Sequence, residues 1–381
     1  MLLMIPGPVE LSPAVKAAAA TPAPSHVAPD LVAAFGRVLG GMRRVWKAPE
    51  GAQPFVLAGS GTLAMEMAVC NVVDAGDPVL VVDTGYFSAR MAIMLERRGA
   101  QVRLVSAEPG HTVAPDQVEA ALQQRPARAV FVTHVDTSTG VRADVQGIAR
   151  VAKAHDALVL VDGVCATAAE QLDQRADGVD VYLTASQKAI GAPPGLAMLV
   201  ASPAALAARA QLSHLPPLSM DFDAWRPVME GYESGSPRYF ATPATSLILA
   251  ADAAFAELAI HGTEAVWARH QATADRMRSA WRHLGLSLLP HDEGIAANTL
   301  SAVRYPNGVD ASFLAGVKER GVVVAGGLHP LLKPTYFRVG HMGWVTTRPD
   351  LLATTVRAIG EALADAGHRA DIDAAVDAVG P

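Results

Sequence analysis

The feature that most constrains the fold of this sequence is an alternation of short apolar runs with longer helical segments between residues 54 and 183. The apolar runs are continuous and rich in valine and leucine, which is typical of strands buried on both faces of a sheet. Strands that alternate with helices in this way form a parallel sheet with right-handed crossovers, so the sequence predicts an α/β fold. The expected strands are residues 54–58, 78–82, 101–105, 129–134, 158–161 and 181–183, and the expected helices are 62–73, 88–99, 115–124 and 144–155.

The pattern changes after this alternation. A long helical stretch is expected over residues 246–281, with Gly262 as the candidate break. We expect three parts: an N-terminal segment, residues 1–20, packed at the domain interface; a large α/β domain, residues 21–245; and a small α+β domain, residues 246–381. The remaining expected elements are helices at 30–46 and 348–366 and short strands at 286–289, 299–303, 321–324 and 336–339.

Composition limits the class of protein. Of the 381 residues, 51% are apolar, which is enough for a large buried core. The net charge of −6 argues against a nucleic-acid-binding surface, because phosphate neutralisation needs clustered basic residues. Two cysteines cannot build a disulfide framework, and we find neither a basic leader nor a continuous apolar run long enough to span a bilayer. We therefore expect a cytoplasmic protein with no membrane or nucleic-acid partner.

Small and polar residues follow the expected strands, at the edge of the sheet where ligands bind in α/β folds. Residues 59–62, Gly-Ser-Gly-Thr, connect a strand to a helix, and their backbone N–H groups suit a phosphate. The same turn matches Gly-x-Gly-x-x-Ala, with Ala64 in the last place, and Asp83 ends the next strand 22 positions after Gly61. That is also the pattern of a dinucleotide-binding turn. A tight turn, a phosphate site and a dinucleotide site therefore stay open for this motif.

Two ionisable residues follow later strands. Asp162 comes after the apolar run 157–161, where burying an unpaired carboxylate is expensive, so a partner or a function is expected. Lys188 precedes a rigid Gly/Pro turn, which suits a lysine held in place for Schiff-base chemistry. A phosphate cradle, a carboxylate for a pyridinium nitrogen and such a lysine are together what pyridoxal phosphate requires. Phe87, or Tyr86 beside it, would stack on the ring.

Several motifs of the chain occur together in one enzyme family. They stand at residues 4–8 (Met-Ile-Pro-Gly-Pro), 59–62, 85–90, 133–140, 162–164, 186–189 with 193–195, 239–243 and 337–343. The most specific is Ser-Gln-Lys-Ala, followed shortly by Pro-Pro-Gly. By these motifs the sequence resembles class V, fold-type I pyridoxal-phosphate aminotransferases of the alanine–glyoxylate and serine–glyoxylate group over nearly its whole length. The resemblance implies a mainly parallel sheet of the seven-stranded type, sandwiched by helices, with a smaller C-terminal domain.

The resemblance also implies roles for residues of the expected site. Lys188 would attach pyridoxal 5'-phosphate as a Schiff base, Asp162 would pair with the pyridine nitrogen, and Phe87 would stack on the ring. Arg338 would bind the substrate carboxylate through a bidentate pair, and Gly7 would lie at the substrate. Ser60, Gly61, Thr62 and Gln187 would hold the phosphate, Thr137 would contact the ring hydroxyl or the substrate, and Tyr239 and Thr242 would reach the active site of the neighbouring subunit in a homodimer.

The implied reaction moves an amino group from a small amino acid, serine or alanine, to a small 2-oxo acid, glyoxylate or pyruvate. Residues 264–270 also resemble pyridoxamine–pyruvate aminotransferase, which uses free pyridoxamine, so that activity is an alternative. A cysteine desulfurase-like lyase is a rival, but it needs a mobile cysteine, and neither Cys70 nor Cys165 is expected on a flexible loop. An NAD-dependent oxidoreductase is the rival suggested by the turn at 59–62, and it would leave Lys188 without a role.

Overall fold

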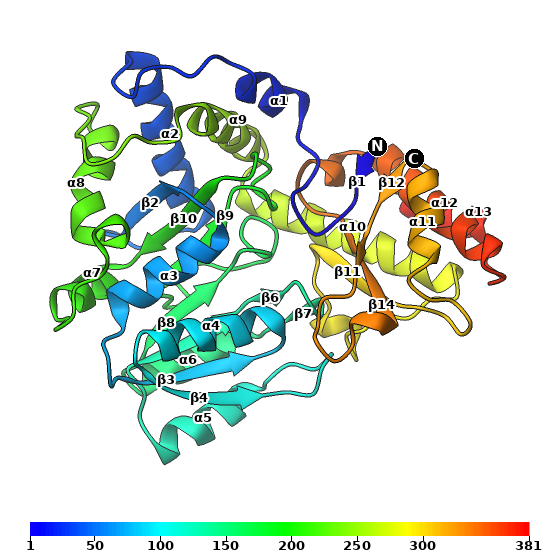
Figure 1. Ribbon diagram of the computed structural model, residues 1–381, viewed down its shortest axis with the longest axis horizontal. Helices are drawn as coiled ribbons and strands as arrows, with labels where there is room; N and C mark the ends of the chain where they lie inside the picture. Colours follow the sequence, from blue (N-terminus) through cyan, green and yellow to red (C-terminus); the bar gives the residue numbers. More distant parts are fainter. Residues whose placement is uncertain (381) are drawn as a thin grey trace.

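The computed structural model describes residues 1–380, and a seven-stranded sheet forms its centre (Figure 1). Neighbouring strands run parallel except at β10, which is antiparallel to both of its neighbours. The predicted α/β fold class with a mainly parallel sheet is thereby confirmed. In spatial order the strands are β2 (Gln53–Ala58), β10 (Leu196–Ala201), β9 (Val181–Ala185), β8 (Leu158–Asp162), β5 (Ala129–Thr133), β3 (Pro78–Asp83) and β4 (Gln101–Ser106).

The sequence pattern does not predict β10, although every residue of that strand is buried. Its run Leu-Ala-Met-Leu-Val-Ala contains one β-branched residue, so composition alone does not separate it from a buried helix. The other central strands bring their carboxyl ends together: Thr133 pairs with Asp162, and Asp162 pairs with Leu183. The polar residues that follow β5, β8 and β9 therefore lie side by side.

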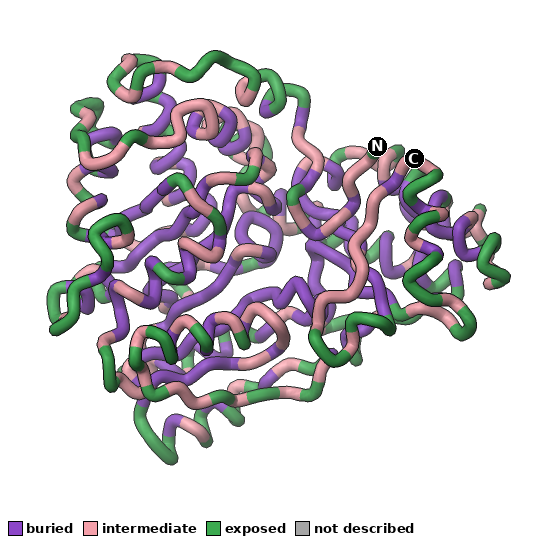
Figure 2. The backbone as a smooth tube through the Cα atoms, in the orientation of Figure 1, coloured by how far each residue is buried: buried purple, intermediate pink, exposed green. Residues whose placement is uncertain are grey.

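Helices cover both faces of the sheet and enclose a large apolar core, which is seen as the buried interior of Figure 2. Helix α2 begins one residue earlier than the sequence predicts, with Pro29 at its first position, where proline's fixed φ and missing N–H are favourable. The helices of this part are α1 (Pro13–Ala19), α2 (Pro29–Val45), α3 (Gly61–Val72), α4 (Tyr86–Arg97), α5 (Pro115–Gln124), α6 (Val145–Ala154), α7 (Pro203–Ala210) and α8 (Phe222–Glu233).

The expected long helix is two helices, α9 (Thr245–His261) and α10 (Thr263–His283), which meet at an angle of 88°. Gly262 makes the break, because its φ of +77° suits glycine and ends the helical hydrogen-bond pattern. In residues 1–380 no single helix is long and apolar enough to cross a membrane; this bent pair passes that test only when its two helices are taken together.

A second, smaller core forms around the C-terminal elements. The strand predicted at 286–289 does not form. Leu288 makes an isolated bridge to Val303, and the backbone bends directly after it, at residues 289–290. The strand predicted at 321–324 is shorter than expected, because only Val322–Val323 form a strand there, paired with Leu2–Leu3. The elements are β11 (Leu300–Arg304), β12 (Val322–Val323), β13 (Ala325–Gly326), β14 (Tyr336–Gly340), α11 (Phe313–Glu319), α12 (Pro349–Asp365) and α13 (Ile372–Val379), with the hairpin β6 (Val135–Asp136) and β7 (Val141–Arg142) on the large part.

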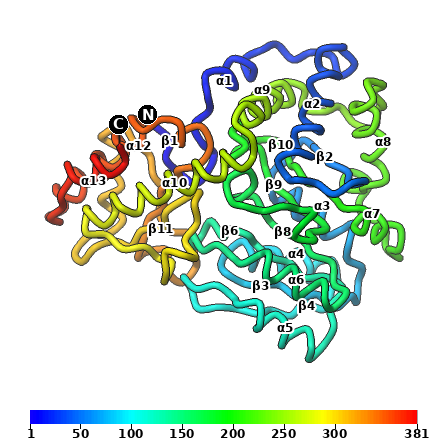
Figure 3. Tube along the Cα trace, turned by 180° about the vertical axis from the view of Figure 1, so that it is seen from behind, coloured from blue at the N-terminus to red at the C-terminus, as the bar shows by residue number. Residues whose placement is uncertain are grey.

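The N-terminal stretch runs from one core to the other, which Figure 3 shows from behind. Strand β1 (Leu2–Leu3) pairs in parallel with β12 of the small part, whereas α1 packs against α9. Buried side chains of α9 belong to the large core, and those at the end of α10 belong to the small one. The division into residues 1–20, 21–245 and 246–381 stays a prediction.

Candidate active site

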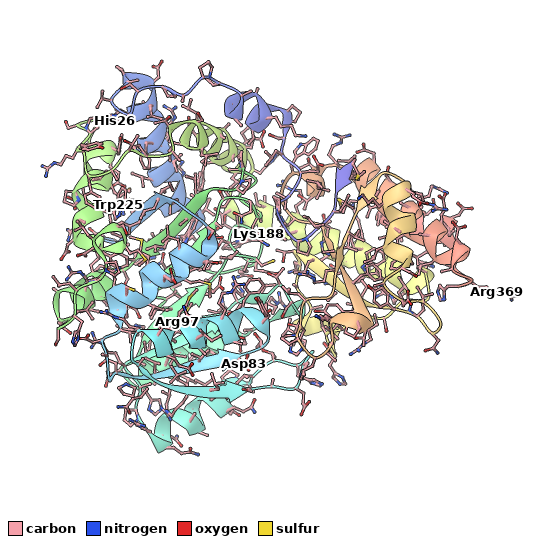
Figure 4. All side chains as sticks on the ribbon, viewed as in Figure 1. His26, Asp83, Arg97, Lys188, Trp225 and Arg369 are labelled. Carbon is pink, nitrogen blue, oxygen red and sulfur yellow. The ribbon has the colours of Figure 1, made fainter. Side chains whose placement is uncertain are left out.

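A cavity of about 170 Å³ lies at the carboxyl ends of the sheet strands. Its lining comes from the segments at or just after the ends of β2, β3, β5, β8 and β9, where a ligand site is expected in such a sheet. Lys188 lies between the sheet and the C-terminal part (Figure 4). The predicted site residues that line the cavity are Ser60, Gly61, Thr62, Phe87, Thr137, Asp162, Gln187 and Lys188.

Lys188 is buried against the N-terminal stretch. Its Nζ donates a hydrogen bond to the backbone oxygen of Pro6, and the backbone N–H of Val9 donates to the Gln187 oxygen at 3.2 Å. Gly7 has a φ of +104°, and a Cβ at this position would lie 2.6 Å from Cδ and 2.8 Å from Nζ of Lys188. Burial lowers the pKa of the Lys188 ammonium, because the charged form loses its hydration. Gly7 thus permits the close approach that encloses the lysine.

Asp162 ends β8 and is buried, with 4% of its surface exposed. Burial raises the pKa of its carboxyl to about 6, and the nearby Asp136 adds to the rise. A hydrogen bond of 2.9 Å from the Val164 N–H to Oδ1 opposes that rise, as do the positive charges of Lys188 and Arg90. Asp162 makes no ion pair within residues 1–380, so it is a buried carboxylate that a cationic ligand would stabilise.

The turn after β2 ends in the N-terminus of α3. Ser60 is the N-cap, but neither its side chain nor an acidic residue caps the first turn of this helix. The first N–H groups of a helix have no intrahelical acceptor and carry a partial positive charge, so they suit an anion. Gln187 adds a second unsatisfied group, because its Oε1 is buried and has no hydrogen-bond partner. This end of the cavity is therefore built for a polar ligand.

Phe87 lies in the first turn of α4, which Asp136 holds in place. Asp136 Oδ2 accepts hydrogen bonds from the backbone N–H groups of Phe87 at 3.0 Å and Ser88 at 3.4 Å. The Arg90 guanidinium lies 5.0 Å from the centre of the Phe87 ring, and its Nη1 donates to Thr62 Oγ1 at 3.2 Å. The sequence analysis assigns no role to Arg90 or Asp136. Arg90 stands three positions after Phe87, and that helical spacing is a signal that the two side chains lie on the same face of α4.

Arg338 reaches the site from β14 of the small part. Its Nη1 donates to the Thr137 backbone oxygen at 3.2 Å, and its Nε donates to the Gly326 oxygen at 2.9 Å. Burial lowers the pKa of this guanidinium, yet no carboxylate forms an ion pair with it among the described residues. A half-buried arginine that lacks an anionic partner beside the cavity is suited to bind a substrate carboxylate.

Tyr239 and Thr242 do not line the cavity of their own chain. Both are exposed, Tyr239 to 67%, and the Tyr239 ring lies 5.3 Å from that of His26. They belong to the irregular segment between α8 and α9. Their contact with a neighbouring subunit stays a prediction.

The family model for class-V aminotransferases matches residues 41–357, which is most of the chain. This protein belongs to the class-V aminotransferases. It is 39% identical over 363 residues to alanine–glyoxylate aminotransferase 1 of Saccharomyces cerevisiae, covering 92% of this chain and 94% of that one. It is 33% identical over 357 residues to L-aspartate–glyoxylate aminotransferase of Paracoccus denitrificans, covering 90% and 87%. Its structure is similar to that of pyridoxamine–pyruvate aminotransferase from Mesorhizobium loti, with a TM-score of 0.92, 26% identity and coverage of 100% and 96%.

Membership of this family decides among the chemical interpretations of the motifs. Because the chain is an aminotransferase, we interpret the turn at residues 59–62 as part of an aminotransferase site and not as the dinucleotide-binding turn of a nicotinamide enzyme. Asp83 does not line the cavity; its Oδ1 accepts from Ser88 Oγ at 2.7 Å and so helps to cap α4. Cys165 lines the cavity and is buried three residues after β8, and Cys70 lies within α3. Neither thiol stands on an exposed loop, where a desulfurase carries its cysteine.

Proposed function

We propose that this aminotransferase uses pyridoxal 5'-phosphate and moves an amino group from a small amino acid, serine or alanine, to glyoxylate or pyruvate. The observation that carries the proposal is the placement of Lys188 and Asp162 in one enclosed cavity with the open N-terminus of α3 at its edge. These groups suit a phosphorylated pyridine aldehyde in its three recognised parts: aldehyde carbon, ring nitrogen and phosphate.

The polar groups left unsatisfied in the cavity fit this cofactor. The first N–H groups of α3 have no anionic partner within the chain, and the buried Asp162 carboxylate has no cationic one. Lys188 would hold the aldehyde carbon, Asp162 the protonated ring nitrogen, and Phe87 the ring face. The phosphate would be held by Ser60, Gly61, Thr62 and Gln187, and Thr137 would lie by the ring hydroxyl or the substrate.

When bound, pyridoxal phosphate supplies an electron sink for the carbanion that forms at the α-carbon of an amino acid. The chain's own contribution is proton transfer and orientation. Because burial lowers the pKa of Lys188, its Nζ is more readily neutral than an exposed lysine, and a neutral amine takes up the α-proton. The same Nζ then returns a proton. The carboxylate of Asp162 would favour a proton on a ring nitrogen held beside it, because a positive charge there would offset the burial of its own negative charge.

The substrate class follows from Arg338 and from the space available. Its guanidinium lies beside Thr137 and has free donors for a carboxylate, which amino and 2-oxo acids share. We expect Gly7, which contacts Lys188, to border the substrate. The lining residues leave a small cavity beside Lys188 and Asp162, so we propose that the substrates are small. The relatives in yeast and Paracoccus are both named for glyoxylate, which supports glyoxylate as the acceptor.

A second candidate is the transfer from free pyridoxamine to pyruvate. It is favoured by the likeness over the full chain to the enzyme of Mesorhizobium loti. The N–H groups at the open α3 N-terminus suit an anion and therefore favour a phosphorylated cofactor that stays bound instead.

One experiment separates these functions. Purified enzyme is assayed with alanine, serine, aspartate and free pyridoxamine as donors against glyoxylate, pyruvate and 2-oxoglutarate. We expect the highest kcat/KM for alanine or serine with glyoxylate and poor turnover of 2-oxoglutarate. A preference for free pyridoxamine with pyruvate would establish the second candidate, and turnover of none of these pairs would refute both.

We further propose a cytoplasmic homodimer in which Tyr239 and Thr242 complete the phosphate site of the neighbouring subunit. Their exposure in a single chain and the two free thiols support this arrangement. The test mixes Lys188→Ala chains with Tyr239→Phe/Thr242→Ala chains after mild denaturation. If the segment crosses between subunits, each hybrid dimer regains one intact site and activity rises above either parent. No gain would show that Tyr239 and Thr242 do not serve the partner's site.

A further inference from the structure

A second cavity, of about 340 Å³, lies where α9, α10 and the 3₁₀ segment Gly343–Thr347 meet. None of its lining residues is shared with the cofactor cavity. Its lining includes Ala189, Ile190 and Gly191, which directly follow Lys188 in the chain. The two cavities are thus distinct but separated by the turn that carries the lysine.

Arg269 of α10 lines this cavity with most of its donors free. Its Nε donates to Thr346 Oγ1 at 3.0 Å, and within residues 1–380 it makes no other hydrogen bond and no ion pair. Burial lowers the pKa of this guanidinium, and no acidic group opposes that shift. A half-buried arginine that lacks an anion is costly, and its two terminal nitrogens form a fork that matches a carboxylate.

Glu257 of α9 lines the same cavity and carries the charge opposite to that of Arg269. Its Oε1 accepts a hydrogen bond of 2.6 Å from Ser12 Oγ, and no cation forms an ion pair with it among the described residues. The cavity therefore presents a carboxylate and a guanidinium that each contact only a neutral hydroxyl. Had these two charges been needed for stability alone, pairing them with one another or with a neighbour would have been the simpler arrangement.

The rest of the lining suits a small organic ion better than an inorganic one. Trp344 forms an aromatic wall. The Arg348 guanidinium at 5.0 Å and Lys16 Nζ at 5.8 Å from the centre of its ring already face it, so the indole offers the ligand an apolar surface. Ile260 adds an apolar surface that is 77% exposed. His270 is fixed, because its Nε2 accepts from the Gly343 N–H at 2.9 Å and its Nδ1 bonds the Val266 oxygen at 2.8 Å.

From this geometry we propose that the cavity is a second binding site of the enzyme, for a small amino-acid zwitterion. The carboxylate of the ligand pairs with Arg269, and its ammonium group lies toward Glu257. Such a ligand rests on the turn 189–191 and on Gly343, which follows β14. It therefore contacts the segments next to both Lys188 and Arg338 without entering the cofactor cavity.

The test uses glycine betaine as the probe, because its quaternary nitrogen carries no hydrogen and cannot react at a pyridoxal aldehyde. Isothermal titration calorimetry is performed on the full-length holoenzyme and on three variants. We expect one site per chain in the wild type. Arg269→Gln should weaken binding at least tenfold and Glu257→Gln several-fold, whereas Arg338→Gln, in the proposed active site, should leave binding unchanged. Acetate, which lacks the cationic group, should bind more weakly than betaine.

The opposite pattern overturns the proposal. If Arg338→Gln abolishes binding and Arg269→Gln does not, betaine occupies the active site only. If inorganic phosphate binds as tightly as betaine and Glu257→Gln has no effect, the cavity is a simple anion site. If the wild type shows no saturable binding and Arg269→Gln changes the oligomeric state by sedimentation, the cavity is covered in the assembly. Thermal unfolding of each variant shows whether it is folded. The Arg269→Lys variant keeps the positive charge but loses the forked guanidinium, so it separates a loss of the contact from a folding defect.

Discussion

Replacing Gly7 by alanine tests whether the N-terminal stretch positions Lys188. The added methyl group would lie 2.6 Å from Cδ and 2.8 Å from Nζ of the lysine, whereas an ordinary contact begins at 3.4 Å. The side chain must therefore move by roughly 1 Å, and a displacement of that size in a catalytic group costs about 10²-fold in rate. The φ of +104° adds backbone strain of about 1–3 kcal/mol, which lowers the free energy of unfolding.

Gly76→Ala is the matched control for this substitution. Gly76 also has a positive φ, +86°, but it lies in the turn between α3 and β3, and a Cβ there meets nothing within 4 Å. It carries the backbone strain without the collision. We expect both variants to lose stability in urea unfolding, but only Gly7→Ala to lose about 10²-fold in kcat for alanine and glyoxylate. Cofactor content, measured by absorbance, corrects kcat for incomplete loading. Equal kcat values for the two variants would show that Gly7 does not position the lysine.

Four further outcomes are expected. Lys188→Ala should lower kcat by about 10²–10⁴-fold and abolish the cofactor adduct that borohydride reduction leaves on the chain, as read by mass spectrometry. Arg338→Gln should lower kcat/KM for the amino acid by about 10–100-fold, the value of a lost charged hydrogen bond. The double variant Cys70→Ser/Cys165→Ser should keep its turnover, and a loss would favour the lyase alternative. Asp162→Asn should abolish activity yet raise the free energy of unfolding of the cofactor-free protein at pH 7.5 by up to about 3 kcal/mol in urea titrations, because the pKa of Asp162 rises from 3.8 to about 6 on folding. That gain should vanish near pH 4, since the cost of the buried charge grows only as pH rises toward 6.

The parallel part of the sheet could be predicted because its strands are buried on both faces and so carry a simple signal. β5 and β8 are continuous apolar runs, and their predicted bounds differ from the observed ones by one residue. β10 was not predicted, because its pairing depends on the turn that follows Lys188 and on contact with β2, some 140 positions earlier. The C-terminal helix α13 was also missed, since its short apolar face gains stability only by packing against α10 and α12.

The grouping of the predicted residues around one cavity could be predicted, because each of these residues lies at or soon after the end of a strand. The site could not be predicted where a distant backbone segment completes the enclosure. Pro6 and Lys188 are 182 positions apart, and only the fold places the Pro6 oxygen at Nζ. The anchoring of α4 by Asp136 has the same origin, because Asp136 lies in β6 whereas the N–H groups that it accepts from lie in the first turn of α4, about 50 positions earlier. Neither contact leaves a periodic signal in the sequence.

The two central ionisable groups also support the proposed cofactor on electrostatic grounds. Burial disfavours the charged forms of both Lys188 and Asp162, so the pKa of the lysine falls and that of the carboxyl rises. Because the two pKa values shift in opposite directions, the protein alone does not fully stabilise the charged forms of Lys188 and Asp162. Lys188 Nζ donates its hydrogen bond to the Pro6 oxygen instead. A protonated pyridine nitrogen would restore the charge balance at Asp162, while attachment of Lys188 to an aldehyde carbon would remove its need for hydration. The free energy that burying these two groups costs the fold would thereby contribute to the affinity for the proposed cofactor.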